Sequence, residues 1–485
     1  MKSIALVAVW AAIGGARAMQ FQTPLYSSYA FNPLEHLAGI TPYFEPADPP
    51  RDPKPPQGCS VTRAAYLVRH AAINANDFDY ESYLEPFLHK LGNSSLDWSK
   101  IPQLSFLTTW EPPSLAEQEL LTRTGKVEAA QLGLSISYRY PKLRLPQRVW
   151  TSTAERTVMS ANNLVRGLEI DERTINVVEI PEGKEEGADS LTPYKSCKGY
   201  SASAGSKQQK QYVKAYTAPI IARLETLAPG FNFTLSDVVA MQAMCGYDTV
   251  IRGSSPFCST NLFSPDEWLQ FEYGQDIQYH YNTGYGSPYS GAIGFPWLNA
   301  TMGLLSADTA AQDLYISFTH RELPPTVLVA MGLFNNSQFS NGDNVNDTMP
   351  LDQINYNRAW VSSRILPFLT NVAIERMNCT SNYGVAATQA QVRNGSDATS
   401  SDVATYYRVL LNQSPQVLPG CFDGPGQSCS ADGMREFLRS RGDVFGAYSS
   451  ICGNTYTNST DSVSFYTNSN NGTTVSKKRR RSLIE

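Results

Sequence analysis

The fold is decided by the stretch AAYLVRH, residues 64–70, in which a short apolar run ends in an arginine and a histidine. A second apolar run, residues 314–319, is also followed directly by a histidine, His320. Runs of this length and composition predict buried strands of a parallel sheet. Ligands of open α/β sheets bind outside the carboxyl ends of the strands, so we expect the two histidines to share one site.

A third apolar run, residues 148–151, brings Arg156 toward the same edge. A Ser-x-x-Glu pattern favours a helix that begins near Ser152, and an apolar run at residues 175–180 predicts the next strand. Strand, helix and strand in this order are typical of a βαβ unit. An arginine in the first turn of a helix is unusual unless an anion binds nearby. Two imidazoles and two guanidiniums at one sheet edge predict an anion site, with phosphate as the first candidate.

The composition indicates a large exported protein. The chain has 485 residues, of which 42% are hydrophobic, so it can bury a large core. Its formal net charge of −5 argues against nucleic acid as the main partner. Residues 1–18 are predicted to be a secretory signal peptide, with Lys2, an apolar segment at residues 4–13 and a small-residue cleavage pattern. No later stretch reaches the roughly 18 apolar residues that cross a bilayer, so we expect a secreted protein without a membrane span.

Eight cysteines and ten Asn-X-Ser/Thr sequons fit an exported protein. Disulfides persist in oxidising compartments. The chain has no CxxC pair and no histidine near its cysteines, so we expect four disulfides and no metal site. Spacing alone leaves roughly a hundred pairings open. N-linked glycans are expected on some of the sequons, which lie at Asn93, Asn232, Asn299, Asn335, Asn346, Asn378, Asn394, Asn412, Asn458 and Asn471.

The chain is predicted to divide into an arm, a main domain and a tail. Residues 19–58, rich in proline from residue 41 onward, are expected to form an extended arm laid over the domain. Residues 59–455 form the α/β domain in this interpretation. A smaller helical subdomain is inserted into it at about residues 77–140 and 195–300, the second of which is rich in aromatic residues. Residues 456–485, rich in Ser, Thr and Asn with a basic end, are predicted to be disordered.

Two helix starts bear on the site. A capping box predicts a helix over residues 114–134. Thr319 and Glu322 also fit a capping box, but that register places Pro324 at the fifth helical position, where its ring and missing N–H are costly. A helix that begins near Leu323 is more consistent with this proline. Glu322 is then not used as a cap, and its carboxylic acid can protonate a leaving alkoxide.

His70 has two interpretations. It is either a histidine whose hydrogen bonds are satisfied at the end of a strand, or a nucleophile that accepts a phosphoryl group and passes it to water. A neutral imidazole suits the second role. Neighbouring guanidiniums would hold the phosphate oxygens through paired hydrogen bonds.

These motifs resemble those of the histidine acid phosphatases, the branch that includes the fungal phytases. The stretch RHAAINA at residues 69–75 is similar to the family's RHGxRxP, and HRE at residues 320–322 to its histidine followed by an acid. The likeness spans roughly residues 31–452. The resemblance implies an α/β sandwich around a mainly parallel sheet, flanked by helices, with a smaller inserted helical domain.

The resemblance also implies roles for single residues. His70 is the phosphorylated nucleophile, and Arg69, Arg156 and His320 bind phosphate, with no metal or other cofactor required. The fungal phytase pattern implies four disulfides, Cys59–Cys379, Cys197–Cys452, Cys245–Cys258 and Cys421–Cys429.

The sequence departs from the family pattern in both motifs. Ile73 stands at the second arginine of the first motif, with Ala71 at its glycine and Ala75 at its proline. Losing a charge-assisted contact costs about 1.5–3 kcal/mol. In the second motif Arg321 stands at the usual aspartate and the acid moves to Glu322, a spacing that resembles the multiple inositol polyphosphate phosphatases. We hypothesise that Arg321 binds phosphate and supplies the charge that the first motif lacks.

The leading hypothesis is a secreted acid phosphomonoesterase that works through a phosphohistidine. Its substrate is a small-molecule phosphate monoester, either phytate or a broad set of monoesters. The alternative is a catalytically weakened, secreted phosphate-binding glycoprotein, which Ile73 favours. A transferase like phosphoglycerate mutase is disfavoured, because its substrates are cytosolic whereas this chain carries features of export.

Overall fold

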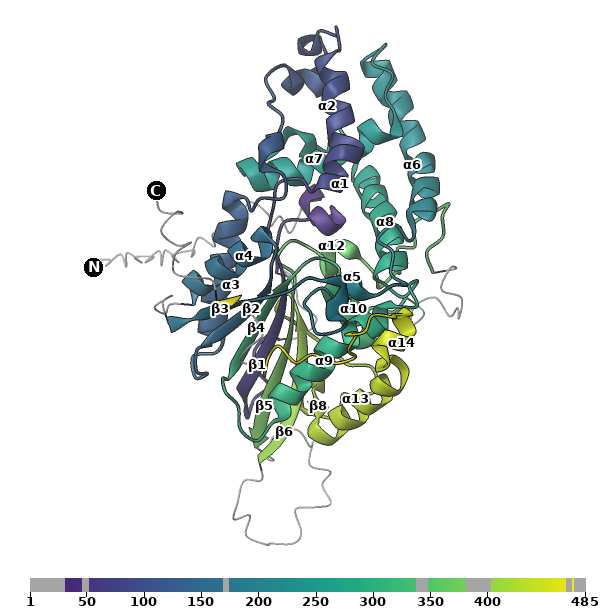
Figure 1. Ribbon diagram of the computed structural model, residues 1–485. Helices are drawn as coiled ribbons and strands as arrows, with labels where there is room; N and C mark the ends of the chain where they lie inside the picture. The colour runs from purple at the N-terminus through teal and green to yellow at the C-terminus, as the bar shows by residue number, and fades with distance from the viewer. Residues whose placement is uncertain are drawn as a thin grey trace, which may run out of the picture.

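A computed structural model describes residues 31–45, 52–168, 174–336, 348–380, 403–467 and 473–474 (Figure 1). The predicted signal peptide and the basic end of the tail lie outside these residues, as do the sequons at Asn346, Asn394 and Asn471. In the described part of the chain, no helix is both long and apolar enough to span a bilayer.

One mixed sheet forms the centre of the molecule, with the strand order β7-β6-β5-β1-β4-β2-β3-β9. Its central strands run parallel to one another, namely β1 (Cys59–Arg69), β4 (Leu314–Thr319), β2 (Arg148–Ser152) and β3 (Asn176–Ile180). Antiparallel strands complete it, namely β5 (Asn371–Thr380), β6 (Val403–Leu411), β7 (Ser414–Gln416), β8 (Cys429–Ser430) and β9 (Thr473–Thr474). The predicted α/β fold, a sheet flanked by helices, is confirmed.

The three apolar runs form adjacent strands. Arg69 at the end of β1 pairs with Thr319 at the end of β4. The next residue of each strand is a histidine, so His70 and His320 leave the sheet together. β2 is the neighbour of β4 on the other side and ends at Ser152. The parallel pairing therefore brings all three runs to one edge, as the sequence predicts.

Helices cover both faces of the sheet. Ala64, Tyr66 and Val68 of β1 belong to the core beneath α3 (Arg123–Arg139) and α4 (Glu155–Gly167). Ala65 and Leu67 alternate with them and face the core beneath α9 (Ser290–Ser306) and α10 (Leu323–Ala330). On that second side α13 (Ala431–Phe445) and α14 (Tyr448–Cys452) pack outside α9 (Figure 1).

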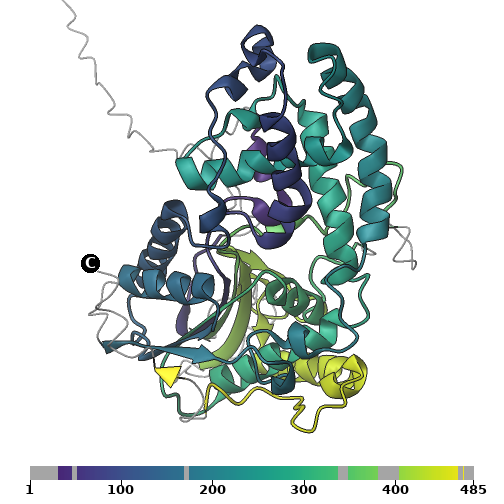
Figure 2. The ribbon, with the colours of Figure 1, turned by 45° about the horizontal axis from the view of Figure 1, so that its top comes forward.

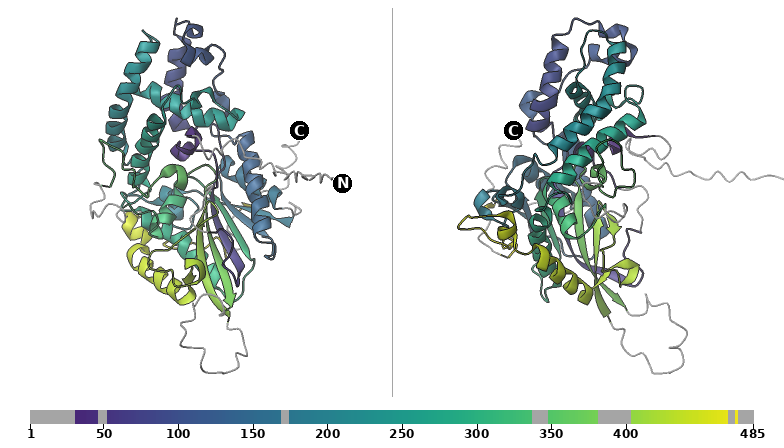
Figure 3. Two further views of the ribbon diagram at one scale, coloured as in Figure 1. Left: turned by 180° about the vertical axis from the view of Figure 1, so that it is seen from behind. Right: turned by 90° about the vertical axis from the view of Figure 1, so that its right-hand side faces the viewer.

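A helical region lies beyond the carboxyl end of the parallel strands (Figures 1 and 2). It contains α1 (Asp77–Asp79), η3 (Tyr80–Leu84), α2 (Glu85–Gly92), α6 (Ser206–Leu227), α7 (Leu235–Arg252) and α8 (Pro265–Asn282). The views from behind and from the side show the same stacking of helices above sheet (Figure 3). Two helices of the expected insertion, α3 and α9, instead pack on the sheet, because their apolar residues join its two cores.

The helix predicted over residues 114–134 begins later than expected. Residues Leu115–Glu117 form only the 3-10 turn η6, and α3 starts at Arg123 with Thr122 as its cap. The capping-box prediction is wrong because Glu119 adopts a left-handed φ of 60°, which interrupts the helix. In this conformation Glu119 lines the cavity at the carboxyl edge of the sheet.

Of the other two predicted helix starts, that of α4 is displaced and that of α10 is confirmed. α4 begins at Glu155 and not near Ser152, because Ser152 still pairs within β2. α10 begins at Leu323, as predicted from the position of Pro324. Glu322 precedes this helix without forming a side-chain cap.

Both ends of the described chain are more structured than predicted. Residues 33–40 form the 3-10 turns η1 (Pro33–Glu35) and η2 (Ala38–Ile40) instead of an extended arm, because Leu37 and Ala38 are buried. Residues 456–467 were predicted to be disordered, which is wrong. Phe465 and Tyr466 are buried, and the Tyr466 hydroxyl lies 2.6 Å from that of Ser317 in β4.

Four disulfides join distant parts of the fold, in the pairs that the resemblance implies. They are Cys59–Cys379, Cys197–Cys452, Cys245–Cys258 and Cys421–Cys429. Among the described residues, the one group of potential metal ligands consists of Cys421, Asp423 and Cys429. The disulfide removes both thiolates from that group.

The sequon at Asn412 lies inside the folded protein. Its side chain is buried, and its Oδ1 accepts hydrogen bonds from the Thr370 hydroxyl and the Asn371 backbone, both at 2.9 Å. Its Nδ2 donates to the Arg364 carbonyl. By contrast, Asn93, Asn232, Asn299 and Asn458 are exposed.

Candidate active site

A cavity of about 260 Å³ lies at the carboxyl edge of the parallel strands. Its lining includes the six residues that the sequence analysis assigned to catalysis or phosphate binding, Arg69, His70, Arg156, His320, Arg321 and Glu322. Arg69 is the last residue of β1 and His70 follows it. His320, Arg321 and Glu322 follow β4, and Arg156 lies in the first turn of α4. The structure therefore brings the whole predicted set together.

One nitrogen of the His70 imidazole is held by the backbone, and the other keeps a lone pair. Its Nδ1 lies 2.9 Å from the Ala71 carbonyl oxygen, which can only accept, so Nδ1 carries the proton and Nε2 keeps a lone pair. Burial is the main cause that holds the pKa of His70 well below its ordinary value, and the charges of Arg69 and Arg156 add to it. The ring centroids of His70 and His320 are 5.9 Å apart.

Arg69 is a buried cation with hydrogen-bonding capacity to spare. Its Nη1 donates to the backbone carbonyls of Gly39, at 2.7 Å, and Leu366. Its guanidinium carbon lies 4.6 Å from the centre of the Phe368 ring, and its buried Nε has no partner. Burial lowers the pKa of Arg69 to about 10, so it remains charged at neutral pH. A buried cation with an unused donor is suited to an anion.

Arg156 is paired with a carboxylate that the sequence analysis did not identify. Its Nη1 donates to Oε2 of Glu119 at 2.7 Å. Glu119 reaches this position from the left-handed turn before α3, where its backbone N–H donates to the Ala75 carbonyl. No sequence signal identifies Glu119, because the local pattern favours a helix there. The carboxylate of Glu119 therefore pairs with an arginine that is predicted to bind phosphate.

Arg321 and Glu322 form an ion pair in the cavity. The Arg321 Nε donates to Oε1 of Glu322 at 3.0 Å. Burial works against ionisation of this carboxyl, but Arg321 and His320 together hold the pKa of Glu322 below its ordinary value. Ile73 and Arg321 line the same cavity.

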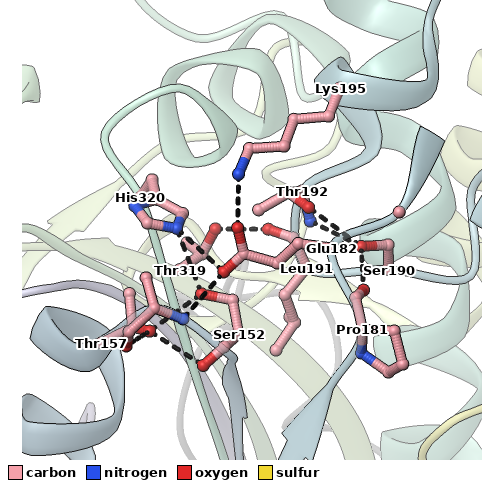
Figure 4. Close-up of polar contacts among 12 residues, drawn as sticks. Ser152, Thr157, Pro181, Glu182, Ser190, Leu191, Thr192, Lys195, Thr319 and His320 are labelled. Atoms are coloured by element: carbon pink, nitrogen blue, oxygen red, sulfur yellow. Dashed lines mark hydrogen bonds and ion pairs between the residues drawn. The ribbon is translucent and has the colours of Figure 1, made fainter.

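His320 is held by Ser152 at the end of β2 and by Glu182 in the loop after β3 (Figure 4). Its Nε2 lies 3.1 Å from Oε1 of Glu182 and 3.3 Å from the Ser152 hydroxyl. Glu182 follows the end of β3 and also pairs with Lys195 of α5 (Pro193–Ser196). The rule that located His70 applies to Glu182 too, since it is a polar residue just past a predicted strand.

The outer wall of the cavity differs in character from its floor. Beyond the six predicted residues, the lining consists of Ile40, Ile73, Asn76, Asp77, Phe78, Glu119, Tyr247 and Phe368. The cations among the described lining residues are three arginines, with no lysine. The floor can therefore hold one phosphoryl group, whereas the wall is apolar, aromatic and acidic.

Known proteins share the sequence pattern and the fold of this chain. A family model described as histidine phosphatase superfamily (branch 2) matches residues 62–412. A phytase of Candida albicans is 26% identical over 431 residues, covering 85% of this chain and 86% of that protein. A thiamine-repressible acid phosphatase of Schizosaccharomyces pombe is 29% identical over 460 residues, covering 89% and 92%. The crystal structure of the phytase from D. castellii has a TM-score of 0.79 at 22% identity, covering 95% and 96%.

Proposed function

Because this chain belongs to branch 2 of the histidine phosphatase superfamily and is thus a phosphomonoester hydrolase, we propose that it is a secreted acid phosphatase that works through a phosphohistidine. The observation that carries the proposal is the His70 imidazole. Its Nδ1 is fixed by the Ala71 carbonyl and its Nε2 lone pair is free to attack, beside three arginines in one cavity.

The reaction follows in two displacements. Nε2 of His70 forms a bond to phosphorus while the bond from phosphorus to the ester oxygen breaks. Glu322 gives its proton to that oxygen, which leaves as the alcohol. The oxygen of a water molecule then bonds to phosphorus while the bond from phosphorus to Nε2 of His70 breaks. Glu322 accepts a proton from that water, inorganic phosphate departs, and the His70 imidazole is restored. Arg69, Arg156 and Arg321 neutralise the phosphoryl oxygens, and His320 donates a hydrogen bond to them.

The mechanism requires a proton on Glu322, so we expect the activity to be higher at acid pH. In the free site Arg321 keeps this carboxyl ionised. A bound phosphoryl group takes up the charge of Arg321, and its own negative charge raises the pKa of Glu322. In acid the monoester also carries a proton that it can pass to this carboxylate. His70 meanwhile stays neutral, because its pKa lies well below the ordinary value. Activity is therefore retained in acid and lost as the pH rises.

The lining of the cavity favours a range of simple monoesters over a highly charged substrate. The lining holds three arginines, and we propose that they surround one phosphoryl group while the wall that includes Asp77, Phe78 and Tyr247 faces the leaving group. A substrate with many phosphates would bring its further charges against this wall. The relatives include both phytases and acid phosphatases, and none of their names supports the alternative of a weakened binding protein.

The proposal is tested by the release of inorganic phosphate. The purified protein is assayed with p-nitrophenyl phosphate, an alkyl phosphate and phytate across acid and neutral pH. We expect turnover of all simple monoesters in acid, with phytate the poorer substrate per enzyme molecule. Absence of release from every ester at every pH would contradict the proposal.

The charge that Arg321 supplies can be measured as phosphate binding. We expect Arg321→Ala to raise the inhibition constant of inorganic phosphate by about ten- to a hundredfold, because a charge-assisted contact contributes about 1.5–3 kcal/mol. Ile73→Arg in the Arg321→Ala background should recover part of the loss, and Arg321→Lys should keep part of it. An inhibition constant that Arg321→Ala leaves unchanged would end the hypothesis.

The carboxylate on Arg156 should weaken phosphate binding in the wild-type protein. We expect Glu119→Gln to lower the inhibition constant of phosphate about two- to fivefold at neutral pH, a gain in keeping with a partly exposed ion pair. Glu117→Gln, an exposed acid on the same turn, is the control. Weaker phosphate binding in Glu119→Gln would show that Glu119 instead helps to orient Arg156.

A further inference from the structure

Four adjacent strands each deliver a polar side chain to the same edge, and the fourth has no role in the mechanism above. Along the sheet these residues are His70 after β1, His320 after β4, Ser152 at the end of β2 and Glu182 after β3. The side chain of His320 is 4% exposed and that of Glu182 is 11% exposed. The contact between them is therefore shielded from solvent, where a carboxylate has a strong effect on an imidazole.

Glu182 is fixed by groups other than His320 as well (Figure 4). Its Oε1 accepts a hydrogen bond from the backbone N–H of Ala154, at 3.1 Å, just before α4. Its Oε2 pairs with the ammonium of Lys195. Burial opposes ionisation of this carboxyl, but its contacts with His320 and Lys195 prevail and hold the pKa of Glu182 below its ordinary range. The carboxylate is thus both charged and immobile.

The contact determines which ring nitrogen of His320 carries a proton. A carboxylate can only accept, so Nε2 of His320 is a donor, and Nδ1 is the nitrogen left for a ligand. In a neutral ring with its proton on Nε2, Nδ1 is an acceptor and would meet phosphoryl oxygens lone pair to lone pair. Only the imidazolium has a second proton on Nδ1 to donate.

We propose that Glu182 is a positioning residue that keeps His320 as a doubly protonated imidazolium, an inference that rests on the proposed function. In this form Nδ1–H of His320 donates a hydrogen bond to a phosphoryl oxygen. The negative charge of Glu182 stabilises this cation, and the Ala154 and Lys195 contacts keep the carboxylate in place. The other charged and titratable groups of the cavity that His320 lines include His70, Glu322 and the guanidiniums of Arg69, Arg156 and Arg321. The carboxylate of Glu322 also favours the cation, whereas the guanidiniums oppose it. Glu182 differs from Glu322 in bonding directly to the ring.

The test compares Glu182→Gln with the wild type. Glutamine keeps the volume and an acceptor for His320 and Ala154 but removes the charge. We expect kcat/KM to fall roughly ten- to a hundredfold, as when carboxylates that orient metal-binding histidines are removed. Glu182→Asp, which keeps the charge, should lie between the two.

A direct measurement separates this role from a structural one. The chain has five histidines, so labelling histidine with nitrogen-15 gives a readable spectrum, in which His320→Gln assigns the resonance of His320. With inorganic phosphate bound, the titration midpoint of His320 should fall in Glu182→Gln and remain in Glu185→Gln, a change at an exposed acid of the same loop. An unchanged midpoint in Glu182→Gln would overturn the proposal.

The two failures are distinguishable. If the wild-type protein releases no phosphate from any monoester, the proposed function fails, while the titration of His320 with phosphate still tests the role of Glu182. If turnover is normal and Glu182→Gln has wild-type kcat/KM and midpoint, the function stands and the inference fails. Thermal unfolding of each variant checks that the fold is retained.

Discussion

We expect His70→Ala to lower kcat by on the order of 10⁴-fold or more, because the variant lacks the atom that attacks phosphorus. Nothing else in the cavity replaces it, since His320 is engaged through Nε2 by Glu182. The measurement is release of inorganic phosphate from p-nitrophenyl phosphate in acid, with enzyme concentrations high enough to detect the residual rate. Binding of inorganic phosphate should be retained, because the arginines of the cavity are intact.

Two variants control for disturbance of the fold. His70→Asn keeps a side-chain donor for the Ala71 carbonyl, the contact that fixes the ring in the wild type, but it has no nucleophilic nitrogen. It should be as inactive as His70→Ala. His89→Ala changes an exposed histidine of α2 and should be fully active. Turnover of His70→Asn within tenfold of the wild type would exclude His70 as the nucleophile.

The second large effect is expected for Glu322→Gln, and it should depend on the leaving group. General acid catalysis contributes about 10²–10⁴-fold when the departing oxygen needs a proton. An alkyl phosphate should therefore lose turnover by roughly that factor. p-Nitrophenyl phosphate should lose far less in its first displacement, because nitrophenolate leaves without a proton. The glutamine oxygen can still accept from Nε of Arg321, so the arginine should stay in place.

The comparison of esters is the decisive part of this experiment. Asp77→Asn alters another acid of the cavity lining and should change all esters to a similar, small degree. A plot of turnover against leaving-group acidity should be steeper for Glu322→Gln than for either the wild type or Asp77→Asn. Equal losses for all esters in Glu322→Gln would show that Glu322 orients Arg321 and is not the proton donor.

The sequence was sufficient for the parallel strands at the centre of the sheet and for the six predicted residues of the cavity. Residues 64–70, 148–151 and 314–319 are apolar enough to mark buried strands without any knowledge of their partners. Parallel strands end at a common edge, so the residues after each run were predicted to meet, and they do. The family resemblance, which the comparisons confirm, supplied the disulfide pairs that spacing left open.

The features that sequence reasoning missed depend on contacts between distant segments. Glu182 lies two residues past a predicted strand, and its contact with His320 arises because β3 lies next to β2 in the sheet. Glu119 reaches Arg156 through one left-handed residue inside a pattern that favours a helix. The burial of Tyr466 and Asn412 likewise follows from tertiary partners, Ser317 and Asn371 among them, and not from composition.

The most direct measurement is the capture of the phosphorylated enzyme. The protein is mixed with excess monoester and stopped within one turnover in alkaline denaturant, which preserves phosphohistidine, and its peptides are then mapped by mass spectrometry. The account predicts one acid-labile phosphoryl group on the peptide that contains His70, absent from His70→Asn. Full turnover with that peptide unmodified, or the same modification in His70→Asn, would contradict it.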